Sequence, residues 1–407
     1  AQLSRGLGDV YKRQTEYHHQ RENLDTVSDE DIVDNPYPVR PKTTQSTSTS
    51  EPLPQPKINN RDPTLTKWIK NALSNHSEIC AQSEFDIGCI PNSEFKIEFL
   101  KSVDTKPIRC AEYPHNIKDV DEIERQLRLM IKMGLISRSE SPWRFPTFIV
   151  PKKNGEARIV FDYRKLNAIT KRLAYSLPSI PNLIRKFKGK EWISTIDIKS
   201  GYWHIPIRPS DRQKTAFIFN GKVYEWNVMP FGPTNAPPHF QKVMDRIFDD
   251  LDYVMVYMDD ITILSNNPQQ HQHHLQEVFH RLAQYKIKIR PDKCAFAQLS
   301  VPYLGFDVDG DGIRIRPKYK DKIHHIPTPK TLNQLRRFVG MVQYLHQFIP
   351  NLQLQLKPFH ALTQKGRQFK WNDELDAAFQ SIKQLVMNAD IIHHPDPSKP
   401  FRLYCDA

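Results

Sequence analysis

The sequence predicts an α+β fold, and three observations support this. Short apolar runs of the kind found in strands alternate irregularly with longer runs of helical period through the middle of the chain. Mainly helical patterns follow them, unlike the regular strand–helix alternation of a parallel α/β sheet. No internal repeat is visible, and 407 residues are too many for a single core, so we expect about two to four subdomains.

The first part of the chain contributes little to that pattern. Residues 1–60 are rich in Pro, Ser and Thr and poor in apolar side chains, which predicts a disordered linker. Within them, residues 1–14 differ in character from the rest of the linker and resemble translated adapter sequence, so they are expected to be artefactual. Residues 61–110 are expected to be an N-terminal extension, and the globular pattern is clear from residue 111 onward.

One helix and three strands open the globular part. Apolar residues at helical spacing in 119–134 predict the helix. Two β-rich runs, 145–153 and 157–164, flank Asn154-Gly155, a dipeptide typical of two-residue hairpin turns, so they are expected to pair. The apolar run 191–198 predicts the third strand.

Two helices are predicted to surround a second hairpin. Residues 235–251 carry prolines at a helix start and then apolar residues at helical spacing. Residues 253–264 form two short apolar runs around a turn, and 273–285 again have a helical period. The middle of the chain therefore mixes strands and helices.

The C-terminal part is predicted to be helical. Thr331 and Gln334 form a capping box ahead of an apolar helical pattern. Asn372 is placed to cap a further helix in the same way. Helices therefore follow the mixed region instead of alternating with it.

The net charge of +12 is unevenly distributed. Residues 152–190 hold eleven Lys or Arg against Glu156 and Asp162, and residues 314–337 hold eight against Asp321. Blocks of one sign interleaved with aromatic rings indicate a polyanion partner, with a merely soluble basic surface as the alternative. The aromatic residues of the first block are Tyr163, Tyr175, Phe187 and Trp192. Nucleic acid is the partner that this composition favours.

Membrane and disulfide classes are disfavoured. No apolar run approaches the roughly 18 residues needed to span a bilayer, and no signal-peptide pattern opens the chain, so we expect no membrane partner. The five cysteines are scattered without a Cys-x-x-Cys spacing, which argues against a disulfide framework or a zinc cluster and favours a reducing compartment.

Two adjacent carboxylates, Asp259 and Asp260, interrupt the apolar run "YVMVYMDDITIL" at 253–264. An acidic hairpin turn is the simplest interpretation. Neighbouring carboxylates repel, however, and a divalent cation with hard oxygen ligands relieves that repulsion. Asp197, 62 residues earlier, ends a predicted strand. If that strand lies beside the hairpin, three carboxylates converge, and such a cluster can hold two ions roughly 3.5–4 Å apart.

Six sequence blocks, taken together, resemble those of a known family. "RIVFDYRKLN", "STIDIKSGYWHIPI", "DRQKTAF", "MPFGPTNAPPHFQ", "VYMDDITILS" and "PYLGF" occur in the order, and close to the spacing, of the characteristic blocks of reverse transcriptases. The pattern is most similar to the gypsy type of LTR retrotransposon, and the resemblance covers about residues 105–407.

The resemblance implies a right-hand polymerase fold with an antiparallel palm sheet, followed by a helical connection and the first strand of a truncated ribonuclease H domain. Asp406 would be the first carboxylate of that last domain, and one strand with one Asp is not expected to give ribonuclease H activity. The implied regions are fingers and palm at 111–315, thumb at 316–370, connection at 371–395 and ribonuclease H start at 396–407.

The resemblance also assigns catalytic residues. Asp197, Asp259 and Asp260 look like the palm carboxylates, and the carbonyl of Ile198 looks like a further metal ligand. The implied cofactor is a pair of Mg²⁺ ions, for which Mn²⁺ can substitute.

Further residues match nucleotide- and primer-binding positions. Tyr202 resembles the steric gate that excludes a ribose 2′-hydroxyl, and Arg158 resembles the residue that clamps the incoming triphosphate, a role suited to a delocalised charge. The other implied nucleotide-binding residues are Lys153, Phe231, Gly232 and Met258. The implied primer- and template-binding residues are Tyr303, Leu304 and Gly305.

The implied function is that of an RNA-directed and DNA-directed DNA polymerase that extends a primer 3′-hydroxyl with dNTPs. Its partners would be an RNA template, a DNA primer–template and an RNA–DNA hybrid. It would be located in the cytoplasm, inside a retrotransposon particle. No sequence feature indicates an oligomeric state. An RNA-dependent RNA polymerase is the enzymatic alternative, which Tyr202 disfavours. A decayed or domesticated nucleic-acid-binding module without catalysis is the non-enzymatic alternative.

Two further motifs imitate metal sites. Residues 307–318 resemble a calcium loop, but its twelfth position is Lys318 where a bidentate Glu is required, so a glycine-rich hairpin turn is expected. His271–His274 could ligate zinc together with Cys294, but no second cluster at ligand spacing accompanies them. A solvated helix start is the expectation there.

Overall fold

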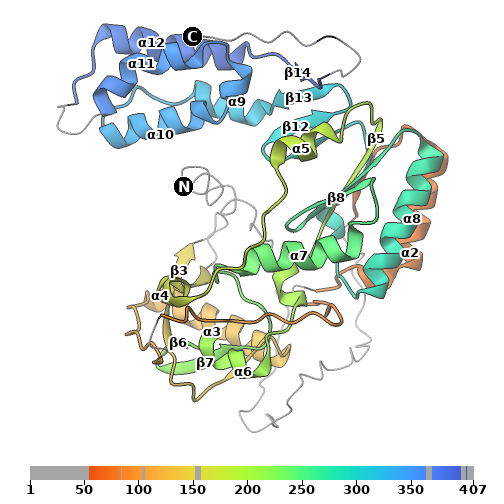
Figure 1. The fold of residues 1–407 in the computed structure, drawn as a ribbon, viewed down its shortest axis with the longest axis vertical. Coiled ribbons are helices and arrows are strands. Elements are labelled where there is room, and N and C mark those ends of the chain that lie inside the picture. Colours follow the sequence, from red (N-terminus) through yellow and green to blue (C-terminus); the bar gives the residue numbers. More distant parts are fainter. Residues whose placement is uncertain are drawn as a thin grey trace. The chain divides into compact units, whose positions relative to one another are not determined.

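The computed structural model describes residues 55–83, 85–102, 106–151, 157–363, 369–395 and 400, and it divides into two compact units (Figure 1). Unit 1 consists of residues 1–177, 194–263 and 268–296, and unit 2 of residues 178–193, 264–267 and 297–407. The predicted linker up to residue 54, the Asn154-Gly155 turn and the ribonuclease H residue Asp406 lie outside the described residues.

The sheet that carries the three predicted carboxylates has five strands in the order β1-β10-β5-β9-β8. β8 and β9 form the antiparallel hairpin expected from the sequence, and β1 pairs in parallel with β10 at the opposite edge. Most side chains of β5, β8 and β9 are buried, which explains their continuous apolar runs. The strands are β1 (Lys57–Ile58), β5 (Trp192–Asp197), β8 (Val254–Tyr257), β9 (Asp260–Ser265) and β10 (Ala295–Gln298).

Three helices of unit 1 support this sheet. α7 packs against β8, and α2 and α8 run side by side (Figure 1). Prolines open α7, as predicted, and its apolar stripe faces the core. The helices are α2 (Pro63–Asn75), α7 (Ala236–Phe248) and α8 (Pro268–Gln284).

A second five-stranded sheet, in the order β2-β7-β6-β3-β4, completes unit 1 together with α3 (Ile117–Lys132). β3 and β4 pair antiparallel, as the two β-rich runs predicted. The strands are β2 (Ile136–Arg138), β3 (Phe145–Pro151), β4 (Ala157–Phe161), β6 (Phe217–Phe219) and β7 (Lys222–Trp226). Short helices connect these parts: η1 (Ser77–Ile79), α4 (Arg164–Ile169), η2 (Gly201–His204), α6 (Pro209–Arg212), η3 (Gln213–Thr215) and η4 (Pro291–Lys293).

Unit 2 combines an antiparallel sheet, β11-β12-β13-β14, with a cluster of helices. α12 lies in the segment expected to form a separate connection, yet it packs with α9 and α11, and the rings of Phe338 and Phe379 lie 4.5 Å apart. The predicted caps of α10 and α12 are confirmed. The elements are α5 (Ile180–Arg185), β11 (Ser300–Tyr303), β12 (Phe306–Asp309), β13 (Gly312–Ile315), α9 (Pro317–His324), α10 (Leu332–Gln343), η5 (His346–Phe348), α11 (Leu352–Thr363), α12 (Asp373–Met387) and β14 (Ile392–His393).

The folded region begins earlier than the predicted linker allows. Lys57 N donates to Cys294 O at 3.1 Å and Asn59 N to Phe296 O at 3.1 Å, so residues 57 and 58 are part of the sheet. The composition of residues 1–60 does not indicate this strand, because an edge strand of two residues needs only backbone hydrogen bonds.

Aromatic residues of the basic block mostly belong to the core. Tyr163, Phe187 and Trp192 are 2%, 0% and 6% exposed, so these rings do not contribute to the basic surface that the charge pattern predicted. Tyr175 is half-buried and donates to Asp245. Burial of these rings is a long-range effect that local composition does not reveal.

The two imitated metal motifs have structural explanations. Residues 307–318 form most of the β12–β13 hairpin and the start of α9, and in the hairpin turn Asp309 Oδ1 accepts from the backbone of Asp311 and Gly312. The expected solvated helix start is wrong: His271 and His274 are buried, and His271 is paired with Ser194 at 2.7 Å. Among the described residues, no helix is both long and apolar enough to cross a membrane.

Candidate active site

The β8–β9 hairpin turns through two residues. Tyr257 pairs with Asp260, which leaves Met258 and Asp259 as the central residues of the turn. Met258 has a φ of 56°, a conformation that suits the twist of a tight hairpin but strains a residue with a side chain. Surrounding contacts must therefore hold this turn in place.

Asp197 lies beside that turn. β5, which ends at Asp197, is the neighbour of β9 in the sheet, as the sequence required for convergence. Ile198 N donates to Asp259 O at 3.0 Å, and Arg290 N donates to Asp197 O at 2.9 Å. The backbones of the two predicted metal-binding segments are thus joined directly.

Gly201 keeps the side chain of Asp259 in its present position. A Cβ atom at residue 201 would lie 2.6 Å from Asp259 Oδ1 and 2.6 Å from Phe240 Cζ. Phe240 has no room to withdraw, because it is fully buried in α7. The glycine is required here by a close approach of backbone to carboxylate.

Electrostatics favour protonation of Asp259 when no cation is present. Burial, followed by the negative charges of Asp260 and Asp197, raises the pKa of Asp259 to about 8, while Arg290 opposes the rise. Burial also raises the pKa of Asp197, which is opposed by Arg290, whose Nε lies 3.6 Å from Asp197 Oδ1. These carboxylates repel one another as their sequence positions suggested.

The donor chemistry fits a divalent cation. Oδ1 of Asp259 is buried, and no hydrogen-bond donor among the described residues reaches it. A hard oxygen of this kind, flanked by two further carboxylates, is what Mg²⁺ or Mn²⁺ binds. In the part of the chain that the structure describes, no three His, Cys, Asp or Glu side chains converge as a ligand set for a metal ion.

Three predicted nucleotide-binding residues lie next to the turn. Tyr202 lies on η2, and it is 1% exposed. Its ring centroid lies 4.8 Å from that of Phe231, and its hydroxyl is 4.0 Å from Met258 Sδ. The structure therefore groups Tyr202, Phe231 and Met258.

The remaining predicted nucleotide-binding residues are more dispersed. Arg158 lies on β4 opposite Val150, and Lys153 lies outside the described residues. Gly232 has a φ of 113°, and its carbonyl accepts from Asn167 Nδ2 at 2.9 Å. Gly232 also lines a shallow depression of 390 Å³ that the sequence reasoning missed. Its other lining residues are Phe148, Phe161, Asp162, Tyr163, Arg164 and Asn167.

The predicted primer-binding residues form a turn of unit 2. Tyr303 pairs with Phe306, so Leu304 and Gly305 are the central residues of the β11–β12 hairpin, with φ of 46° and 93°. Leu304 O accepts from the hydroxyl of Tyr344 at 2.7 Å. The side chain of Tyr303 is 2% exposed, which leaves Leu304 and Gly305 as the accessible part of this motif.

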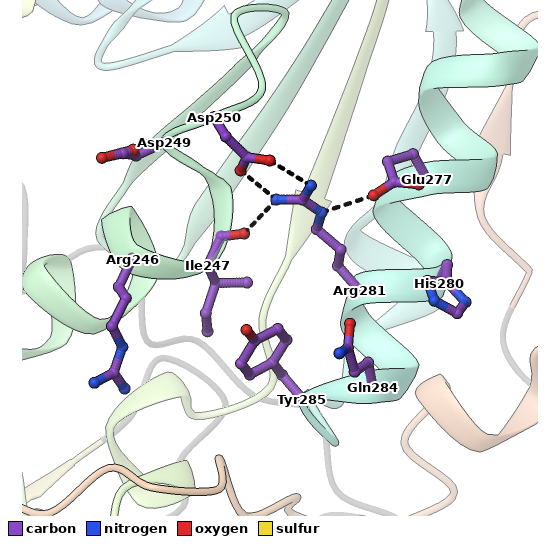
Figure 2. Close-up of a pocket in the computed structure, with 9 residues that line it drawn as sticks. All are labelled: Arg246, Ile247, Asp249, Asp250, Glu277, His280, Arg281, Gln284 and Tyr285. Atoms are coloured by element: carbon purple, nitrogen blue, oxygen red, sulfur yellow. Dashed lines mark hydrogen bonds and ion pairs between the residues drawn. The ribbon is translucent and has the colours of Figure 1, made fainter.

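A cavity of 630 Å³ is separate from these residues. Figure 2 shows it between the end of α7 and α8, where Arg281 binds the carbonyl of Ile247 and the carboxylates of Asp250 and Glu277. It contains none of the predicted site residues. The bonds of Arg281 join α8 to the end of α7 and to the segment that leads into β8.

One buried polar residue beside the turn was missed by the sequence reasoning. Gln241 of α7 is fully buried, and its Oε1 accepts from Met258 N at 2.9 Å. Only the apolar positions of this helix entered its prediction. A polar residue directly after Phe240 on the apolar face was the available signal.

Comparison with known proteins identifies the class to which this fold and site belong. Residues 150–308 match the family "Reverse transcriptase (RNA-dependent DNA polymerase)", and residues 371–407 match "RNase H-like domain found in reverse transcriptase". The chain contains a reverse transcriptase domain, and the resemblance carried by the six sequence blocks is confirmed. That family uses divalent metal ions.

The particular relatives are polyproteins of transposons. The chain is 33% identical over 320 residues to the Transposon Tf2-3 polyprotein of Schizosaccharomyces pombe, covering 78% of this chain and 24% of the relative. It is 34% identical over 316 residues to the Retrovirus-related Pol polyprotein from transposon 297 of Drosophila melanogaster, covering 76% of this chain and 30% of the relative. The chain therefore spans about a quarter to a third of these relatives.

Solved structures of a foamy viral protease-reverse transcriptase share the fold. The structure in complex with dsDNA has a TM-score of 0.78 at 26% identity, covering 84% of this chain and 71% of that one. The structure in complex with RNA/DNA hybrid has a TM-score of 0.75 at 26% identity, covering 82% of this chain and 45% of that one. The predicted α+β polymerase fold is confirmed.

Proposed function

We propose that this chain is the polymerase part of a retrotransposon RNA-directed DNA polymerase that also copies DNA. The observation that carries the proposal is the junction of Ile198 with the Asp259 turn inside a reverse transcriptase domain. It places a strand-borne carboxylate, Asp197, next to a hairpin-borne pair on a rigid sheet. Ligands on strands hold the geometry that a two-metal transfer requires.

In this proposal Asp197, Asp259, Asp260 and the carbonyl of Ile198 hold two Mg²⁺ ions, for which Mn²⁺ substitutes. When bound, the ions lower the pKa of the primer hydroxyl and neutralise the charge of the leaving pyrophosphate. The orphaned, buried Oδ1 of Asp259 supports this role. The raised pKa of Asp259 means that protons compete with the metal for this oxygen.

The other residues act on the nucleotide. Arg158, with Lys153, binds the triphosphate of the incoming dNTP, and Phe231 and Gly232 form the floor of its pocket. Tyr202 restricts the space beside the sugar, because its ring is packed between Phe231 and Phe240 and is unable to swing away. A ring held in this way excludes a ribose 2′-hydroxyl, which disfavours RNA synthesis.

The nucleic-acid partners are an RNA template, an RNA–DNA hybrid and a DNA primer–template. Support comes from the exposed face of α10, where Arg336 and Arg337 lie one turn before Gly340 and Tyr344 follows at the end of the helix. A Cβ atom at Gly340 would meet nothing within 4 Å, so a phosphate backbone can approach this helix closely. Arginines on such a face bind phosphates without reading sequence. Leu304 and Gly305 contact the primer in this proposal.

Primer extension on a heteropolymeric RNA template with dNTPs and Mg²⁺ tests the function. We expect extension by the wild type and none by Asp259→Asn. Asp252→Asn is the matched control, because Asp252 is an exposed carboxylate shortly before the same hairpin. In the same assay rNTPs should be poor substrates for the wild type and better ones for Tyr202→Val.

Two outcomes would contradict the proposal. Absence of extension together with tight, salt-sensitive primer–template binding would favour a nucleic-acid-binding module without catalysis. Efficient use of rNTPs by the wild type would favour an RNA polymerase.

We also infer that the protein is located in the cytoplasm, inside a retrotransposon particle, because transposon polyproteins are among its relatives. Sedimentation of the protein with such particles tests it.

A further inference from the structure

The turn that carries Asp259 is held from two sides. On one side, Ile198 N donates to Asp259 O at 3.0 Å. On the other, Gln241 Oε1 accepts from Met258 N at 2.9 Å. Each of the two central residues thus has one backbone group bonded to a different segment: Ile198, which directly follows β5, bonds one, and Gln241 of α7 bonds the other.

The amide of Gln241 has only one orientation that satisfies its neighbours. Its Nε2 donates to Val256 O at 2.9 Å and to Asp245 Oδ1 at 2.7 Å, while its Oε1 accepts from Met258 N. Rotating the amide by half a turn would set its oxygen against two acceptors and its NH₂ group against a donor. Gln241 is fully buried, so water does not relieve such a mismatch.

An outer pair of residues determines that orientation. Asp245 lies one helical turn beyond Gln241 on the same face of α7, and its second carboxylate oxygen accepts from the hydroxyl of Tyr175. Burial and the hydrogen bond to Asp245 raise the pKa of Tyr175 to about 12, so this hydroxyl remains a donor at neutral pH. Tyr175, Asp245 and Gln241 form a chain of side-chain hydrogen bonds that ends at the turn.

We propose that Gln241 is a positioning residue for the catalytic turn, and that Asp245 and Tyr175 fix the orientation of its amide. This chain of bonds, which we call the Gln241 relay, stabilises the positive φ of Met258 and thereby places the carboxylate of Asp259. The inference rests on the proposed polymerase function but concerns residues that bind neither metal nor substrate. Ladder hydrogen bonds alone do not specify a turn with a strained methionine, which explains why a buried amide is needed there.

Gln241→Met tests the relay, because methionine has similar length and no amide. Gln276→Met, on the exposed face of α8, is the matched control. The measurements are kcat per active site, titrated by burst kinetics, the Kd for primer–template, and hydrogen exchange of the Met258 amide in metal-free protein. We expect kcat to fall by about 10- to 100-fold, since misplacing a reacting group by about 1 Å has an effect of that size. The Kd should not change, and the Met258 amide should exchange faster.

A folded Gln241→Met protein with wild-type kcat and wild-type protection of the Met258 amide would overturn the proposal. If that variant fails to fold, Tyr175→Phe tests the proposal instead, because it removes only one hydroxyl from the half-buried end of the relay. A smaller fall in kcat at unchanged Kd supports the relay, and wild-type kcat with wild-type exchange overturns it. If the wild type does not extend primers, the proposed function is wrong. Hydrogen exchange of the Met258 amide, compared between wild type and variant, then still tests whether the Gln241 relay holds the turn.

Discussion

At the scale of single residues, the site is defined by close approaches to Asp259. Gly201 leaves no space for a side chain beside its carboxylate, Ile198 holds its carbonyl, and no described donor satisfies its Oδ1. Such a carboxylate is destabilised in its charged form until a cation arrives. The raised pKa of Asp259 and its suitability as a metal ligand therefore have one physical origin.

The pKa of Asp259 predicts how stability depends on pH. The folded protein keeps a proton on this carboxyl up to a pKa of about 8, whereas the unfolded chain releases it near the ordinary Asp value of about 3.9. Between those values the unfolded state binds fewer protons, so the free energy of unfolding contributed by Asp259 falls as pH rises and levels off above about pH 8. Asp259→Asn abolishes this contribution.

Thermal unfolding of metal-free protein at about pH 5 and pH 8 measures the effect. The Tm of the wild type should fall relative to that of Asp259→Asn between the two values, and Mg²⁺ should restore it at the higher pH only in the wild type. Asp252→Asn, which alters an exposed carboxylate, should behave like the wild type. Parallel pH profiles of wild type and Asp259→Asn would contradict this account.

At the scale of elements, tight hairpins with positive φ recur in the described residues, and two of them carry predicted site residues. The β8–β9 turn has Met258 in that conformation, and the β11–β12 turn has Leu304 and Gly305. In both, a helical or adjoining side chain bonds the turn backbone: Gln241 in the first and Tyr344 in the second. Strained turns persist where neighbouring elements over-determine them.

Tyr344→Phe is predicted to loosen the second turn without disturbing its packing. The ring of Tyr344 stacks on Phe306 with centroids 5.2 Å apart, and phenylalanine keeps that contact while losing the bond to Leu304 O. One net hydrogen bond is worth about 0.5–1.5 kcal/mol, so the Kd for primer–template should rise by about two- to tenfold at unchanged KM for dNTP.

Fluorescence anisotropy with labelled primer–template provides the Kd for Tyr344→Phe. Tyr319→Phe, on the neighbouring helix α9, is the control, and its Kd should equal that of the wild type. Equal affinity of Tyr344→Phe and wild type for primer–template would show that the β11–β12 turn is not part of the primer site.

At the scale of the whole molecule, the N-terminal extension is part of unit 1. Ile289 N donates to Ile79 O at 2.7 Å, and Ile289 also bridges to Ile198, directly beyond Asp197. Phe95 N donates to Pro206 O at 2.8 Å. The segment before residue 111 therefore covers the backbone that supports the carboxylates.

A chain that starts at residue 111 is expected to lose both stability and activity. Removal of the extension would expose buried partners and leave backbone groups of residues such as Ile289 and Pro206 unsatisfied, each at a cost of about 1–3 kcal/mol. A chain that starts at residue 55 keeps those contacts and should unfold like the full chain. Circular dichroism melts and primer extension of the two shortened proteins measure this; equal behaviour of both would show that the extension is dispensable.

The sequence by itself determined the local features of this protein. Alternating and helical periods predicted the hairpin at 253–264 and helix α7, and side-chain chemistry predicted the caps at Thr331 and Asn372. It also placed Asp197 at the end of a strand, because these signals depend on neighbours a few residues apart. The six blocks added the family, which periodicity alone does not provide.

Only the tertiary structure decided which polar and aromatic residues are buried. The charge pattern placed Phe187 in a block expected to meet a polyanion, and a solvated helix start was expected at His271, whereas both side chains lie in the core. For Gln241 the only local signal was a polar residue on an apolar helix face, and the strand at Lys57–Ile58 gave none. The backbone groups that they bond in β8, the turn and β10 are 15 or more residues away in sequence. Burial and hydrogen bonding between distant segments arise from packing, and packing is a property of the folded chain as a whole.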